Sequence, residues 1–149
     1  MDHELQAAQL FLDGYNCAQA ITVAFSDVTG LDKHLSATLA SSFGGGMGRM
    51  GEVCGAVSGM LMVAGVLYGY DADQDDDAKK AHYALVRELA GKFREEADSI
   101  LCRDLLSNLS SDPNPAPRYA EFYKARPCAR FVMLAARILD AYIAAHPVG

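Results

Sequence analysis

Four cysteines stand at the heads of four apolar stripes that have the period of a helix. The four are Cys17, Cys54, Cys102 and Cys128. This spacing places each sulfur on the core-facing side of its helix, about one turn from the helix N-terminus. Unsatisfied N–H groups and the positive end of the helix dipole favour a thiolate there, the form that attacks disulfides and binds metals. We therefore expect one redox or metal site if these helix starts meet.

The residues around the cysteines agree with helix starts. Asn16 can cap the helix that begins at Cys17, and Ser99 is a candidate cap before Cys102. A glycine-rich run precedes Cys54. The alternative for each cysteine is simple packing, because free cysteine is among the most buried residue types.

Length and charge narrow the class of protein. The chain has 149 residues, which predicts a single domain over residues 1–149 with a core of its own. A formal net charge of −6 argues against nucleic acid or an anionic membrane surface as a partner. The acidic start Met1–Leu5 predicts no signal peptide, hence a cytoplasmic protein. In that reducing setting cysteines indicate metal or redox chemistry before structural disulfides.

Helical periodicity dominates the chain, and the predicted fold is an all-α, single-domain helical bundle. A proline-rich stretch at 110–117 is expected to be a surface loop inside that domain. The expected helices span 3–13, 17–26, 32–42, 52–69, 75–97, 101–108 and 127–145, with a turn near 118–123.

The segment 53–70 contains no charged residue and predicts a glycine-rich, buried central helix. A membrane span is the alternative, but flanking Lys and Arg are missing, so no membrane is expected. Gly55 and Gly59 leave room beside Cys54 for another backbone, a partner subunit or an inorganic cofactor. This helix is also where we would expect the interface of a homodimer.

Other motifs give weaker signals. Gly46–Gly51 matches G-x-G-x-x-G, but a helical pattern precedes it where a dinucleotide site needs a strand, so a flexible lead-in to Cys54 is favoured. Asp71–Asp77 resembles a calcium loop but fits helix capping better. His82 falls on an apolar face, as a core histidine does. Since no Cys-x-x-Cys occurs, any shared cysteine site must be assembled by the tertiary fold.

The order of the four cysteines, with Asn16–Gln19 around the first and Cys54–Gly59 around the second, resembles the redox-active family known by its C_GCAxxG_C_C signature. The resemblance extends from about Gly14 to Cys128. It implies a small helical cytoplasmic protein with a redox role assigned to its cysteines. A similar domain occurs in split-Soret cytochromes, where it resembles an iron–sulfur carrier.

Four functional hypotheses follow. In the first, Cys17, Cys54, Cys102 and Cys128 bind an iron–sulfur cluster, Gly55 and Gly59 provide clearance, and electrons pass to an unidentified redox partner. The second is thiol–disulfide exchange by a cysteine pair, with Cys17 and Cys54 in the best helix-start contexts. The third is a structural zinc site with four cysteine ligands. The fourth is a helical interaction module with packing cysteines.

Overall fold

The computed structural model describes residues 2–71, 76–107 and 128–148, and its regular elements are helices. In these ranges the one extended pairing is an isolated antiparallel bridge between Val53 and Leu101. The elements are α1 (His3–Leu12), α2 (Cys17–Ala24), α3 (Ser26–Thr29), α4 (Lys33–Leu39), the 3-10 helix η1 (Ser41–Phe43), α5 (Gly55–Tyr68), α6 (Asp76–Ala97), α7 (Cys102–Ser107) and α9 (Cys128–Ala145). The all-α prediction is confirmed.

The helix boundaries differ from the predicted ones in three places. The predicted helix 17–26 ends at Ala24 and is followed by the short α3. Gly30 is the C-cap residue of α3 and has a φ of +78°. The predicted helix 32–42 divides into α4 and η1. Helix α5 begins only at Gly55, because Val53 is extended and pairs with Leu101. The predicted loop 110–117 and turn 118–123 lie outside the described residues.

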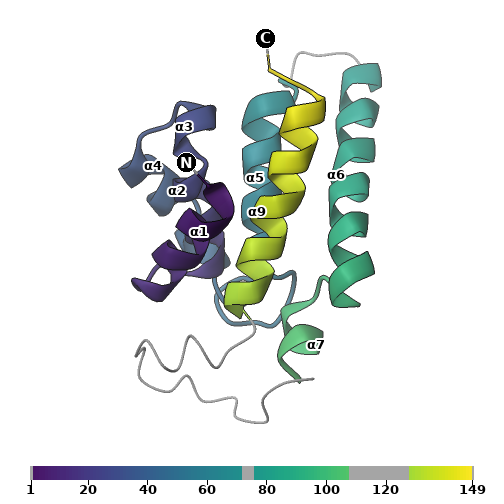
Figure 1. Ribbon diagram of the computed structural model, residues 1–149. Helices are drawn as coiled ribbons and strands as arrows, with labels where there is room; N and C mark the ends of the chain where they lie inside the picture. Colours follow the sequence, from purple (N-terminus) through teal and green to yellow (C-terminus); the bar gives the residue numbers. More distant parts are fainter. Residues whose placement is uncertain (1, 72–75, 108–127, 149) are drawn as a thin grey trace.

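The long helices α5, α6 and α9 lie side by side, and α1 to α4 cover the flank away from α6 (Figure 1). Helix α2 packs mainly on α5, while α1 packs mainly on α9. The core is formed by the apolar faces of these helices. On α6, for example, only one stripe is buried, through Leu85, Leu89 and Phe93. Their spacing of four residues is that of one helix face.

Helix α5 occupies the centre of the bundle, as the sequence predicts, with seven buried residues along its length. It is not enclosed on every side, since Val66 is 46% exposed. No helix among the described residues combines the length and apolarity that crossing a membrane would require.

Two glycines of α5 show where another helix approaches. A Cβ atom on Gly59 would lie 2.8 Å from the Ala18 carbonyl oxygen and 2.9 Å from Ile21 Cβ, both on α2. A Cβ on Gly65 would meet no heavy atom within 4 Å. Of the occupants expected beside Gly59, the structure therefore shows another backbone, that of α2.

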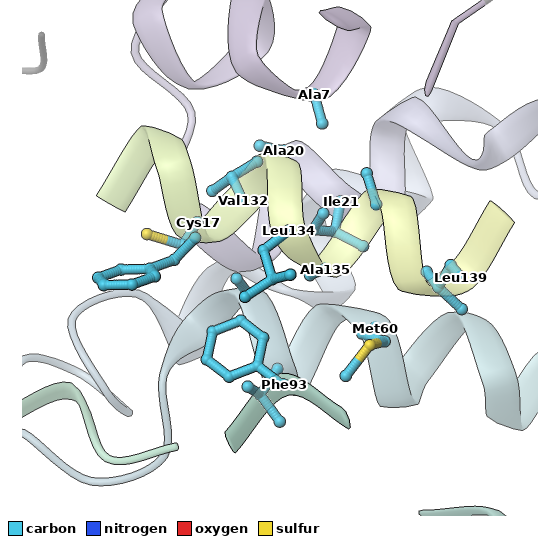
Figure 2. Close-up of a cluster of buried hydrophobic side chains, with 14 of the residues drawn as sticks. Ala7, Cys17, Ala20, Ile21, Met60, Phe93, Val132, Leu134, Ala135 and Leu139 are labelled. Carbon is cyan, nitrogen blue, oxygen red and sulfur yellow. The ribbon is translucent and has the colours of Figure 1, made fainter. Parts of the chain in front are cut away.

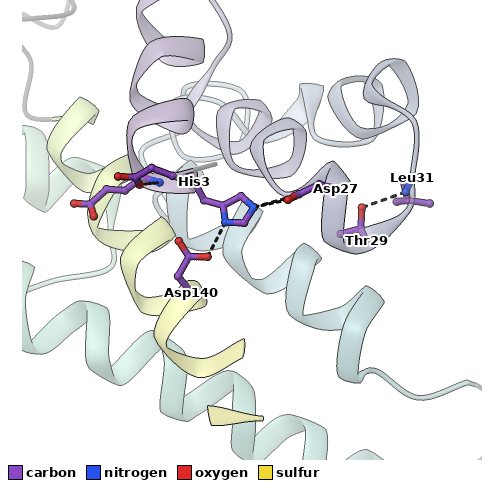
Figure 3. Close-up of polar contacts among 7 residues, drawn as sticks. His3, Asp27, Thr29, Leu31 and Asp140 are labelled. Atoms are coloured by element: carbon purple, nitrogen blue, oxygen red, sulfur yellow. Dashed lines mark hydrogen bonds and ion pairs between the residues drawn. The ribbon is translucent and has the colours of Figure 1, made fainter. Parts of the chain in front are cut away.

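A histidine side chain joins three helices of the bundle. His3 on α1 contacts Asp140 on α9 through Nδ1 at 2.7 Å and Asp27 on α3 through Nε2 at 2.9 Å (Figure 3). Its ring also stacks on Phe25, with centroids 4.2 Å apart. We call His3, Asp27 and Asp140 the His3 cluster. Each ring nitrogen of His3 thus lies within hydrogen-bond distance of a carboxylate oxygen.

Candidate functional site

The four cysteines begin four different helices, as the sequence predicts. Cys17, Cys102 and Cys128 are the first residues of α2, α7 and α9, and Cys54 is the N-cap residue of α5. All four lie in the described ranges, all four are buried, and none is in a disulfide. We call these four residues and their helix starts the thiol end.

The start of α2 is fixed by side chains that also reach α4 and η1. The Asn16 side chain accepts a hydrogen bond from Gln19 N at 2.8 Å, and Gln19 Oε1 accepts one from Asn16 N at 3.1 Å. This reciprocal capping box satisfies two backbone donors. Gln19 also donates to the Ala37 carbonyl and Asn16 to the Ser41 carbonyl. Cys17 therefore follows a cap that is itself anchored to the neighbouring helices.

The backbone bridge at Val53 and Leu101 brings Cys54 and Cys102 together. Cys54 N donates to the Ile100 carbonyl at 2.7 Å, and Cys102 N donates to the Glu52 carbonyl at 2.6 Å. Since side chains alternate across extended backbone, the two cysteines lie on the same face of the bridge. Ser99 stabilises this connection, because its hydroxyl accepts from Leu101 N and donates to Asp104.

Cys17 and Cys128 form the second contact of the thiol end. Their thiols are hydrogen-bonded to each other, although 111 positions separate them in the chain. Cys17 lies at one end of a row of buried side chains that includes Leu134 and Ala135 of α9 and continues toward Leu139 (Figure 2). The pairing thus depends on the packing of α2 against α9.

Cys17 is close enough to the other three cysteines for their charges to affect its ionisation. The hydrogen bond with Cys128 and then burial raise the pKa of Cys17 well above its usual range, and the charges of Cys128, Cys54 and Cys102 raise it further. The ionisation of Cys17 therefore depends on all three of the other cysteines.

Two opposing effects act on the pKa of Cys54. Burial raises the pKa of Cys54 from 9.0 to about 12, although hydrogen bonds from the backbone N–H groups of Ala56 and Val57 lower it. Cys128 and Cys102 add to the increase. The helix start favours a thiolate, as expected from the sequence, but the loss of hydration is the larger effect. Without a bound cation, Cys17 and Cys54 are therefore neutral thiols at neutral pH.

Metal binding can be assessed from the arrangement of donors. Among the described residues, no group of three or more His, Cys, Asp or Glu side chains is placed to hold a metal ion. A single zinc ion needs four donors around one point. An iron–sulfur cluster instead distributes its four cysteine ligands over several iron atoms. Whether the four cysteines hold a cluster or a single ion stays a prediction.

Gly55 borders the site itself. A Cβ atom at Gly55 would lie 2.9 Å from the Phe43 carbonyl oxygen and 3.1 Å from both Cys17 Cβ and Ala18 N. The space left by the missing side chain of Gly55 is therefore occupied by Cys17 and the start of α2. Whether Gly55 or Gly59 contacts a cofactor stays a prediction.

Sequence reasoning did not find the role of Gly46. A Cβ atom there would lie 2.8 Å from Cys102 Cβ. The signal in the sequence is the density of glycines at 44–51, which predicts a flexible lead-in. The structure instead shows a hydrogen-bonded turn next to the thiol end.

The fold and site together define a small helical bundle with four reduced, buried thiols gathered at its helix starts. Residues 15–142 match the family described as Putative redox-active protein (C_GCAxxG_C_C), and the chain belongs to this family. No curated protein and no solved structure matches the chain.

Proposed function

We propose that this protein is an electron-transfer protein in which Cys17, Cys54, Cys102 and Cys128 ligate an iron–sulfur cluster. The observation that carries the proposal is the mutual proximity of the four thiols, each at a helix start and each buried. Such a cluster, when bound, supplies one-electron transfer. Family membership supports the redox role in general terms.

The protein's own residues perform three tasks in this function. The buried helix starts exclude water from the sulfurs. The N–H groups of Ala56 and Val57 donate to Cys54 and stabilise its thiolate once its proton is displaced. The bridge between Val53 and Leu101 keeps Cys54 and Cys102 at a fixed separation, which preorganises two of the four ligands.

The proposal is tested by anaerobic reconstitution of the reduced protein with iron and sulfide, followed by metal and acid-labile sulfide analysis. We expect a coloured protein that retains iron and sulfide in equal amounts after desalting. A colourless, iron-free product contradicts the proposal. Retention of zinc in place of iron, with no inorganic sulfide, favours the structural zinc site instead.

One observation favours a second candidate, thiol–disulfide exchange: the hydrogen bond between the Cys17 and Cys128 thiols. In this reaction the two thiols would lose two protons and two electrons to a partner disulfide, which would be reduced to two thiols. Cys17 and Cys128 replace the pair Cys17 and Cys54 expected from sequence as the closest candidates. Peptide mapping after oxidation by glutathione disulfide would show a Cys17–Cys128 crosslink under this alternative, and scattered or absent crosslinks under the cluster proposal.

The setting of the function is part of the proposal. Four reduced thiols fit a reducing compartment, so we place the protein in the cytoplasm with a redox protein as electron partner. A homodimer and a similarity to the iron–sulfur domain of split-Soret cytochromes stay predictions. Light scattering of the reconstituted protein would test the dimer.

A further inference from the structure

The glycine-rich segment before Cys54 contains a left-handed turn. Five consecutive residues have positive φ, and we call them the left-handed turn: Gly45 (+65°), Gly46 (+72°), Met47 (+68°), Gly48 (+59°) and Arg49 (+66°). Two of the five carry side chains. Each of these two residues is in a backbone conformation that costs an L-amino acid energy. A conformation with this cost persists only where surrounding contacts fix it.

Backbone hydrogen bonds fix the turn from both sides. Gly48 N donates to the Ser42 carbonyl at 2.9 Å, and Arg49 N donates to the Gly44 carbonyl at 3.1 Å. At the other side, Glu52 N donates to the Gly46 carbonyl at 3.0 Å. The turn is therefore a defined element that leads directly into the bridge beside Cys54.

The same segment also holds the start of α7. The Gly51 and Glu52 carbonyls accept from Arg103 N at 3.2 Å and Cys102 N at 2.6 Å. Through these bonds, the position of the turn determines the position of the Cys102 backbone.

Gly46 is the member of the left-handed turn that touches this junction. A Cβ atom there would lie 2.7 Å from Glu52 N, 2.9 Å from Glu52 O and 2.8 Å from Cys102 Cβ. Real Cβ atoms do not approach this closely, so a side chain at Gly46 must displace Cys102 or its hydrogen-bond partner. At Gly48, two residues along the same turn, an added Cβ would meet nothing within 4 Å.

We propose that Gly46 is a positioning residue for Cys102: the absence of a side chain lets the left-handed turn press against Cys102 and hold its thiol in the thiol end. The inference rests on the proposed function only for its redox consequence. The placement of Cys102 itself can be measured in the metal-free protein.

The test compares Gly46→Ala with Gly48→Ala. Both substitutions introduce the same methyl group at a positive φ, so they share the backbone strain. Only Gly46→Ala adds the contact with Cys102. The measurement is the rate of iodoacetamide labelling at Cys102 relative to Cys17 in the reduced, metal-free protein, followed by peptide mass spectrometry.

We expect the Cys102 to Cys17 labelling ratio to rise about tenfold in Gly46→Ala and to stay within about twofold of wild type in Gly48→Ala, since only the first substitution overpacks the contact with Cys102. Equal ratios in the two variants overturn the proposal. In reconstituted protein, Gly46→Ala should also shift the reduction potential or the electron paramagnetic resonance spectrum, whereas Gly48→Ala should not.

The two proposals fail in different ways. If wild type binds no iron but the labelling ratio changes as expected, the cluster is wrong and the role of Gly46 stands. If wild type binds the cluster and the two variants label alike, the role of Gly46 is wrong. Should Gly46→Ala fail to fold, adding Cys102→Gly removes one of the clashing atoms, and partial recovery of helical circular dichroism is expected. No recovery overturns the proposal.

Discussion

The thiol end and the His3 cluster both bring together ionisable groups from helices that are distant in sequence, but the groups interact differently in the two clusters. At the His3 cluster, a ring nitrogen faces each carboxylate, at 2.7 Å for Asp140 and 2.9 Å for Asp27. At the thiol end, the hydrogen bond with Cys128 and then burial raise the pKa of Cys17, and burial raises that of Cys54, with neighbouring cysteines adding to both increases. A ring nitrogen meets a carboxylate at each contact of the first cluster, whereas in the second the four thiols would carry like charges if they ionised.

This difference separates a structural role from a functional one. The contacts of His3 with Asp27 and Asp140 join α1, α3 and α9 without any further group. Four buried thiols gain no comparable stabilisation from one another in the charged state, and they become good ligands only when a cation replaces their protons. The His3 cluster joins helices, whereas the redox chemistry that we propose belongs to the thiol end.

The largest expected effect comes from removing two ligands. In the double variant Cys17→Ala/Cys128→Ala, we expect iron and sulfide retained after reconstitution to fall by at least about tenfold, because two of four ligands are lost. His3→Gln is the matched control and should retain both at the wild-type level. Equal loss in the two variants would show that the thiol end has no special role.

The second-largest effect is expected in the pH dependence of the stability of the metal-free protein. The unfolded Cys54 loses its proton near pH 9.0, whereas the folded residue keeps it until about pH 12. The contribution of the Cys54 thiol to the free energy of unfolding is therefore fully present below pH 9.0. It falls by about 1 kcal/mol per pH unit as the pH rises toward 12. Urea denaturation of wild type and Cys54→Ala across this window measures the difference. Parallel curves for the two proteins would contradict the raised pKa.

The third prediction concerns the two ends of α5. Gly55→Ala should lower the free energy of unfolding by about 1–3 kcal/mol, because its methyl group would press on Cys17 and the Phe43 carbonyl. Gly65→Ala, in the same helix but facing open space, should raise it by about 0.5–1 kcal/mol. Thermal denaturation of the two variants gives the comparison, and the same sign for both would refute the packing argument.

The smallest effect is expected at the His3 cluster. His3→Gln should destabilise the protein by about 1 kcal/mol, since hydrogen bonds to charged groups are lost but both carboxylates are partly exposed to water. The loss should shrink at high salt. Chemical denaturation of wild type and His3→Gln at two salt concentrations measures this loss. If the variant has the wild-type denaturation midpoint at both concentrations, the His3 cluster contributes nothing to stability.

Local sequence signals predicted the helices and the helix starts. The capping box at Asn16 and Gln19 and the apolar stripe behind Cys17 are encoded within a few residues, so periodicity and capping rules find them. The same rules predicted the glycine clearance along α5, because a glycine inside a helix indicates close approach. They did not identify what approaches Gly59, which is set by the crossing of α2.

Non-local features could not be predicted in this way. The contact of Cys17 with Cys128 and the bonds of His3 depend on how α1, α2 and α9 pack. Glycine permits many conformations, so the sequence predicts a flexible segment where the left-handed turn lies. The bonds that select one conformation join the turn to Ser42, Gly44 and Glu52. At Cys54 the helix start lowers the pKa of the thiol, but burial raises it by more, and burial follows from the packing of the whole bundle.

The most direct test of the thiol end is iron K-edge X-ray absorption on protein reconstituted anaerobically. The account predicts a first shell of sulfur only, with a second shell of neighbouring iron, and loss of both shells in Cys17→Ala/Cys128→Ala. Iron with oxygen or nitrogen ligands and no iron neighbour, or a protein that retains no iron, would contradict the proposal that these four cysteines hold a cluster.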